Sequence, residues 1–133
     1  MIPPFLENGY LPPGLHPATI EEVALRFGQE SELRRVQMES VRWMIDLAVR
    51  AGVERIVLNG SFVTDIMEPN DVDCVLLFLP CARRHRQALR ELRTGLPFLE
   101  IAIVTQAQFD EFVNDVFGTD RFDIAKGMIE VIP

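Results

Sequence analysis

The sequence has few cysteines and no long apolar run. Only two cysteines occur in 133 residues, Cys74 in a predicted strand and Cys81 at a predicted helix start. They lack the pairing pattern of a disulfide-rich secreted scaffold. No apolar run reaches the roughly 18 residues of a membrane span, and the N-terminus lacks the basic start and apolar stretch of a secretion signal. We therefore expect a cytosolic protein with free thiols.

An excess of basic residues is also missing. The 20 acidic residues outnumber the 13 basic ones, giving a net charge of -7. General DNA binding requires surplus Lys and Arg to displace phosphate counterions, so we exclude it. The one dense basic group comprises Arg83, Arg84, Arg86, Arg90 and Arg93. We interpret it as a solvated helix face, with an acidic partner surface or the tail of a polynucleotide as the alternatives.

Several common catalytic patterns are absent. His16 and His85 have no cysteine or second histidine nearby in the sequence, which argues against a zinc site. No set of serine, histidine and acid indicates a hydrolase, and no GxxxxGK[ST] phosphate loop is present. Any phosphate chemistry must therefore use other residues.

Four helices are predicted from helical periodicity and capping patterns. They cover residues 19–28, 31–51, 81–94 and 105–118, and capping boxes open the first and last at Thr19 and Thr105. The apolar face of the long second helix is predicted to comprise Leu33, Val36, Val41, Met44, Ile45 and Ala48. Its arginines are interpreted as a solvated face, and they are Arg34, Arg35, Arg42 and Arg50.

Four strands are predicted between or after these helices, over residues 55–58, 72–79, 98–104 and 128–132, the last at a sheet edge. Alternating helices and strands predict an α/β (α+β) fold with a mixed sheet of about four strands flanked by helices. The length fits a single domain over residues 1–133. Five prolines and two glycines in residues 1–18 predict an extended arm without regular structure. Its apolar residues are expected to pack on the domain or on a partner chain.

A Gly-Ser turn followed by two spaced aspartates is the most informative feature. Gly60 and Ser61 follow an apolar strand, and Asp71 and Asp73 open the next one. Side chains alternate along a strand, so both carboxylates would point to one face, from backbone positions roughly 6.6 to 7 Å apart. Magnesium prefers oxygen ligands and takes the rest of its shell from water and substrate phosphates. The pattern favours phosphoryl or nucleotidyl transfer; the alternative is a turn followed by a surface aspartate.

Four residues besides the two aspartates are candidates for the same site. Gly60 permits close approach of the backbone to phosphate oxygens, and Ser61 adds a hydroxyl donor. Glu100 interrupts an apolar strand and is the best candidate for a third metal ligand, unless it simply reaches solvent on an edge strand. Lys126 is a candidate phosphate contact, with an ordinary surface lysine as the alternative.

These residues resemble the nucleotidyltransferase superfamily that includes DNA polymerase β. The resemblance rests on Gly60-Ser61 after an apolar strand, a short spacer, Asp71-Val72-Asp73 and the later Glu100. It implies the nucleotidyltransferase fold, a nucleoside triphosphate as substrate, and one or two Mg²⁺ ions held by these three acidic residues. Residues 11–16, 60–64, 69–73 and 126–129 also resemble a group of short, largely uncharacterised bacterial proteins assigned to this superfamily. That resemblance spans most of the chain and implies no particular substrate.

Two hypotheses follow. The first is a magnesium-dependent nucleotidyltransferase that moves a nucleoside monophosphate from a triphosphate to a hydroxyl group of a protein or RNA acceptor. The acceptor must be presented by another molecule, because one domain leaves no room for a second substrate domain. Short members of the superfamily often carry out such transfers within a toxin-antitoxin pair, so the resemblance makes such a pair one setting for this chain. The second hypothesis is an inactive module of the same fold that binds a partner protein, for example through the arm, and the sequence leaves homodimer formation open.

Overall fold

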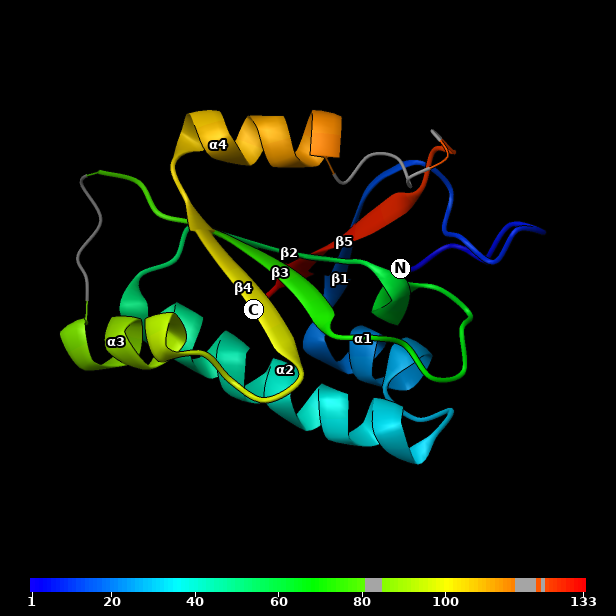
Figure 1. Ribbon diagram of the computed structural model, residues 1–133, viewed down its shortest axis with the longest axis horizontal. Coiled ribbons are helices and arrows are strands. Elements are labelled where there is room, and N and C mark those ends of the chain that lie inside the picture. The colour runs from blue at the N-terminus through cyan, green and yellow to red at the C-terminus, as the bar shows by residue number, and fades with distance from the viewer. Residues whose placement is uncertain (81–84, 117–121, 123) are drawn as a thin grey trace.

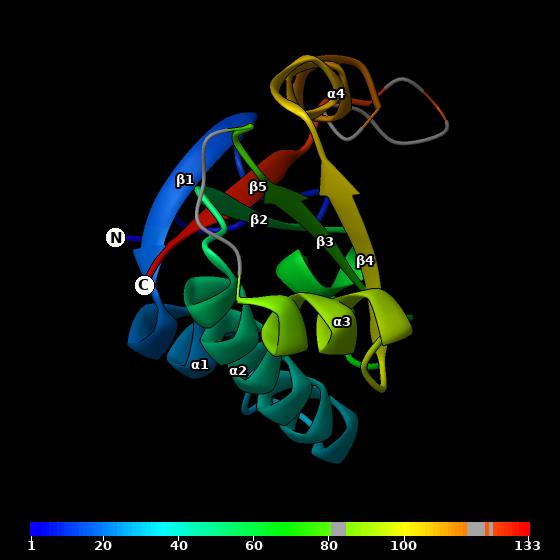
Figure 2. The same cartoon turned by 90° about the vertical axis from the view of Figure 1, so that its left-hand side faces the viewer.

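A mixed β-sheet lies between helices on both of its faces. The computed structural model describes residues 1–80, 85–116, 122 and 124–133. In chain order the elements are β1 (Gly14–Thr19), α1 (Ile20–Phe27), α2 (Glu32–Ala51), β2 (Arg55–Asn59), the 3-10 turn η1 (Ser61–Val63), β3 (Val72–Leu77), α3 (Arg86–Thr94), β4 (Leu99–Val104), α4 (Gln106–Glu111), the π-helical turn η2 (Phe112–Val116) and β5 (Gly127–Ile132). Helix α4 covers one face, and α1, α2 and α3 cover the other (Figures 1 and 2).

The sheet has five strands in the order β1-β5-β2-β3-β4. The pairs β1–β5 and β3–β4 are parallel, whereas β2 is antiparallel to both of its neighbours. The predicted α/β class and mixed sheet are therefore confirmed, with five strands instead of about four.

The additional strand, β1, lies in the segment that was predicted to lack regular structure. Pairing runs from Gly14 opposite Gly127 to Thr19 opposite Ile132. Pro17 is tolerated because β1 is at the edge of the sheet, where one side of the strand needs no ladder hydrogen bond. With β1 outside it, β5 lies inside the sheet, so the prediction of a final edge strand was wrong.

The rest of the N-terminal arm packs on its own domain. Leu11 is fully buried and Ile2 is nearly so. Arg26 of α1 donates a hydrogen bond of 2.9 Å to the carbonyl oxygen of Pro3, and its guanidinium lies 4.4 Å from the ring centre of Phe5. These contacts fix the arm against α1.

The helix starts follow from local capping. Thr19 and Thr105 each form the predicted capping box, and Ser31 caps α2 by accepting a hydrogen bond from the amide of Arg34. Gly52 ends α2 in the left-handed conformation. Two predicted boundaries, the helix start at Cys81 and the helix end at Gly118, lie outside the described residues.

The buried face of α2 differs from the predicted one. Arg34 is only 2% exposed, whereas Val36 is 37% exposed. The interpretation of Arg34 as a solvated side chain was wrong, because its guanidinium bonds backbone carbonyl groups from a neighbouring segment. Arg35 and Arg42 are exposed as predicted. The buried positions of this face share helical spacing, and they include Arg34, Gln37, Met38, Val41, Met44, Ile45 and Ala48.

Apolar side chains fill both sides of the sheet. The larger cluster lies against α1, α2 and α3 and includes Leu58 and Leu76, while the smaller one under α4 includes Val57 and Val75. Residues two apart on a strand share a face, so Asp73 lies on the α4 face with Val75. None of the described helices is long and apolar enough to cross a membrane.

Candidate functional site

The structure brings Asp73 and Glu100 into contact. They are register partners on the parallel strands β3 and β4, so their side chains lie on the same face of the sheet. Glu100 also lies close enough to Asp73 to raise the pKa of its carboxyl group. Two of the three predicted acidic site residues are therefore adjacent.

The carboxyl group of Asp73 holds its proton unusually well. Its pKa is raised from 3.8 to about 6, chiefly by burial and then by hydrogen bonding to Glu100 and the negative charge of Glu100. Asp71 adds a smaller repulsion, and the positive charge of Lys126 opposes the rise. The predicted residues Asp71 and Lys126 therefore lie close enough to Asp73 to influence its charge.

Asp73→Asn is expected to stabilise the unliganded fold at alkaline pH. Between pH 3.8 and about 6 the folded chain keeps a proton on Asp73 that the unfolded chain releases. The stability that this proton contributes to the folded state is lost as the pH rises through about 6. Removing the charge should raise the free energy of unfolding by about 1 kcal/mol at pH 8, after discounting for solvent screening, and much less at pH 4.5. Chemical denaturation at both pH values measures this. Asp46→Asn, on the surface of α2, is the control, and a loss of stability in Asp73→Asn at pH 8 would contradict the prediction.

The acidic residues line one hollow. It has a volume of about 370 Å³ and is lined by Ser61, Asn70, Asp71, Asp73 and Glu100. Glu100 is exposed on the edge strand β4, as the solvent alternative anticipated, and it faces this hollow as well. A second hollow of about 200 Å³ shares Asp73 and Glu100 and continues to Ala102 and Phe112, where its lining is apolar. The two carboxylates thus stand between a polar and an apolar space.

Gly60 packs directly against the carboxylate of Asp73. Its φ of 81° and ψ of -164° belong to a region that is essentially restricted to glycine. A Cβ atom at this position would collide with Oδ2 of Asp73. The glycine is therefore required both by the turn and by the room that the Asp73 side chain takes.

Ser61 connects the two sides of the hollow. Its hydroxyl oxygen accepts a hydrogen bond of 2.9 Å from the backbone amide of Asn70, one residue before Asp71. The hydroxyl hydrogen stays available as a donor, as the phosphate-binding prediction requires. Ser61 thus ties the turn after β2 to the approach to β3.

The donor set fits magnesium in its chemistry, although the side chains do not converge on one point. Asp71, Asp73 and Glu100 offer only carboxylate oxygens, which Mg²⁺ prefers. Among the residues that the structure describes, no three His, Cys, Asp or Glu side chains come together closely enough to hold a metal ion. Asp73 and Glu100 supply two neighbouring carboxylates, and Asp71 lies on the wall of the same hollow. A cation between them would also lower the pKa of Asp73, which burial and the neighbouring carboxylates raise.

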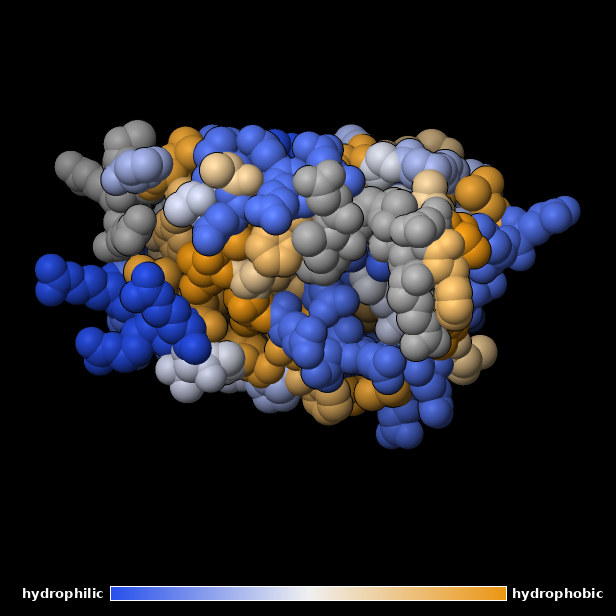
Figure 3. Space-filling model, turned by 45° about the horizontal axis from the view of Figure 1, so that its top comes forward, coloured by the Kyte–Doolittle hydropathy of each residue, from blue (hydrophilic) through white to orange (hydrophobic). Residues whose placement is uncertain are grey.

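The predicted arginine group lies away from this hollow. Arg83 and Arg84 are outside the described residues, while Arg86, Arg90 and Arg93 are exposed on α3 and border an open hollow of about 380 Å³. Figure 3 shows strongly hydrophilic side chains at the left end of the molecule, where α3 lies. Because α3 packs on the sheet face opposite Asp73, these arginines are not part of the carboxylate site.

Asn59 is a residue of the site region that the sequence did not single out as functional. It is fully buried, and neither its side-chain nitrogen nor its oxygen has a hydrogen-bond partner in the described part of the chain. It is the register partner of Asp73, so both lie on the same face of the sheet. The only sequence signal is a polar residue ending an apolar strand directly before Gly60.

Taken together, fold and hollow define an α/β domain with a carboxylate-lined site at one end of a five-stranded mixed sheet. The chain belongs to DUF6932, a family of unknown function, whose sequence profile matches residues 3–132. A search of curated proteins and a search of solved structures each found no match. A more specific function must therefore be argued from the residues of the site.

Proposed function

We propose that this protein is a magnesium-dependent nucleotidyltransferase with the nucleotidyltransferase fold. The observation that carries the proposal is the contact between Asp73 and Glu100 beside the Gly60 turn, in a hollow that also contains Asp71 and Ser61. A half-buried carboxylate beside a second one, such as Asp73 beside Glu100, is costly without a cation or a shared proton. An oxygen-lined site of this kind suits a divalent ion and a triphosphate.

Each residue has a role in this proposal. Asp73 and Glu100, with Asp71 on the wall of the same hollow, would hold the metal, which when bound would neutralise triphosphate charge and lower the pKa of an attacking hydroxyl group. Gly60 lets the backbone approach the phosphates. Ser61 donates a hydrogen bond to them, and Lys126 adds a positive charge near Asp73. Glu100 is exposed and would accept the proton of the acceptor hydroxyl group, whose oxygen bonds the α-phosphorus as pyrophosphate leaves.

The acceptor is a hydroxyl group on another molecule, either a protein or an RNA. The resemblance to small superfamily members makes a toxin-antitoxin pair one setting for such a reaction. A second candidate function is an inactive module of the same fold that binds a partner protein or a second copy of the chain. The lack of three converging metal ligands in the described residues favours this second candidate.

Thermal unfolding with each of the four nucleoside triphosphates, with and without Mg²⁺, tests the proposal. A ligand at one hundred times its dissociation constant should stabilise the fold by about 2.7 kcal/mol. We expect a magnesium-dependent increase in melting temperature for at least one triphosphate, and none in Asp71→Asn/Asp73→Asn. Each variant is compared with its own unliganded state, because Asp73→Asn alone changes stability.

Asp46→Asn is the matched control and should respond like the unchanged protein. If no triphosphate shifts the unfolding of the unchanged protein, the proposal fails and the binding module is preferred. If the double variant retains the shift, nucleotide binding occurs elsewhere. Transfer of label from an α-labelled triphosphate that survives Asp71→Asn would likewise refute the catalytic role of Asp71.

A further inference from the structure

Arg34 is a buried cation whose hydrogen bonds go to backbone carbonyl groups. It is 2% exposed and forms no salt bridge with the residues that the structure describes. Its five N–H groups form six hydrogen bonds of 2.5 to 3.4 Å, because one N–H of Nη2 is shared between two acceptors. The carbonyl oxygens that accept them belong to Phe27, Ser61, Phe62, Thr64 and Ile66. Four of these five residues follow directly on the Gly60 turn. One side chain of α2 therefore binds most of the backbone between Ser61 and Ile66.

Gln37 continues this pattern one helical turn later. It is 1% exposed, and its side-chain nitrogen donates hydrogen bonds of 3.1 Å to the carbonyl of Pro69 and 2.7 Å to that of Asn70. The capping residue Ser31 adds a bond of 3.0 Å from its hydroxyl group to the carbonyl of Met67. The start of α2 thus contacts the whole connection between the Gly60 turn and Asp71.

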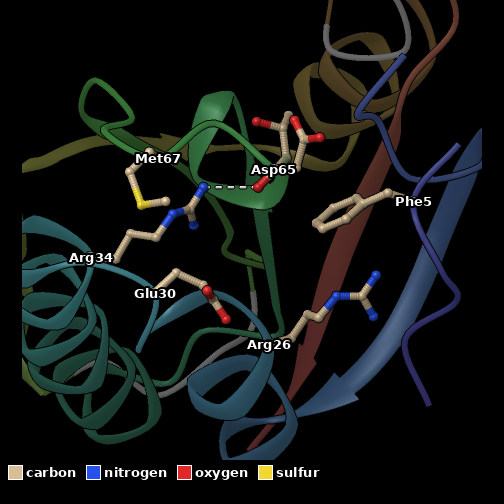
Figure 4. Close-up of a pocket in the computed structure, with 7 residues that line it drawn as sticks. Phe5, Arg26, Glu30, Arg34, Asp65 and Met67 are labelled. Carbon is tan, nitrogen blue, oxygen red and sulfur yellow. Dashed lines mark hydrogen bonds between the residues drawn. The ribbon is translucent and has the colours of Figure 1, made fainter. Parts of the chain in front are cut away.

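We infer that Arg34 and Gln37 are positioning residues, which hold the segment 61–70 so that Ser61 and Asp71 face the same hollow. The part of this inference that concerns nucleotide binding rests on the proposed function. Figure 4 shows the guanidinium of Arg34 pointing at the segment that carries Asp65, at the border of a separate hollow of about 270 Å³. Neither side chain lines the carboxylate hollow, so both act through the backbone that they bind.

The hydrogen bonds form a closed ring through Ser61. Arg34 donates to the carbonyl of Ser61, the hydroxyl oxygen of Ser61 accepts from the amide of Asn70, and the carbonyl of Asn70 accepts from Gln37. Arg34 and Gln37 lie on the same face of α2, three residues apart, which closes the ring. Loss of either side chain frees one end of the Ser61–Asn70 contact.

The chemistry of arginine explains the choice at position 34. The segment 61–70 contains one short 3-10 turn and otherwise no regular element, so its carbonyl groups lack the partners that a strand or an α-helix provides. A guanidinium carries five N–H donors in a planar fork, whereas a lysine ammonium presents three donors from one point. Lysine at this position would keep the charge and lose most of the bonds.

Amide hydrogen exchange tests the inference without relying on nucleotide binding. The variants are Arg34→Lys and Gln37→Met, with Arg35→Lys and Ser40→Ala as controls on the same helix. The informative amides are those of Thr64 and Asn70, which bond to Ser61, and Val57 and Val75 in the sheet provide the reference. We expect exchange at Thr64 and Asn70 to accelerate at least tenfold in Arg34→Lys, and exchange at Asn70 to do so in Gln37→Met. The controls and the sheet amides should not change.

Nucleotide affinity is measured on the same variants at a temperature where each is fully folded. If the unchanged protein binds a triphosphate with Mg²⁺, both variants should bind it at least tenfold more weakly, and the controls should bind it equally well. Unchanged exchange at Thr64 and Asn70 in both variants would overturn the inference. Faster exchange with unchanged nucleotide affinity would overturn the positioning of the binding site. If the unchanged protein binds no triphosphate, the proposed function fails, and the exchange rates alone decide whether Arg34 and Gln37 hold the segment.

Discussion

Replacing Arg34 with alanine is expected to lower the free energy of unfolding by about 3 kcal/mol or more. The substitution removes six hydrogen bonds to five carbonyl groups, and a buried acceptor left without a donor costs about 1 to 3 kcal/mol. Part of the loss is offset, because burial of the guanidinium is itself unfavourable. Burial lowers the pKa of Arg34, while the negative charges of Glu30 and Asp65 act in the opposite direction and raise it. Water that enters the exposed parts of the segment reduces the loss further.

Thermal and denaturant unfolding measure this effect, and a fall in melting temperature of roughly 10 °C is expected. Arg35→Ala is the matched control. Arg35 neighbours Arg34 on α2, but it is exposed and donates a single exposed bond to Gln29, so its loss should cost no more than about 0.5 kcal/mol. Equal stability of the two variants would show that the contacts of Arg34 are replaced by water at no cost.

Gly60→Ala is expected to affect both the stability and the site. The backbone conformation at Gly60 costs a residue with a Cβ atom about 1 to 3 kcal/mol. The added methyl group would also displace the carboxylate of Asp73 from its place beside the turn. Unfolding curves should therefore show a loss of about 2 kcal/mol or more, and the magnesium-dependent response to a triphosphate should disappear.

Gly95→Ala separates backbone strain from the collision. Gly95 also has a positive φ, of 100°, and a Cβ atom there would meet no other atom within 4 Å. This variant should lose stability through strain alone and should retain the nucleotide response. If Gly60→Ala also retains it, then the contact between Gly60 and Asp73 does not matter for the site.

The helices could be predicted because their signals are local. A capping box at Thr19 or Thr105 is decided by residues three apart, and Gly52 ends α2 without help from the rest of the chain. Strand β1 could not be predicted in this way. Its partner lies more than one hundred residues away, and the prolines around it indicate irregular structure when they are considered alone.

Only part of the acidic site could be predicted, because the rest depends on how distant segments align. Alternation along strands placed Asp73 and Glu100 on definite faces, but the register that makes them partners depends on how β3 and β4 align. Asp71 lies before β3 begins at Val72, so alternation does not decide where its side chain points. The burial of Arg34 did have a signal, since it shares helical spacing with Met38, Val41 and Ile45. Its charge led to the opposite interpretation.

The parallel pairing of β1 with β5 also determines the order in which a nascent chain assembles its sheet. Gly14 pairs with Gly127, 113 residues further along the chain. During synthesis β1 leaves the ribosome before the other described strands, yet its one neighbour in the sheet is made after all of them. Closing so long a loop is entropically costly, and such contacts form slowly. Until β5 arrives, β2 presents an open edge that another newly made chain can occupy.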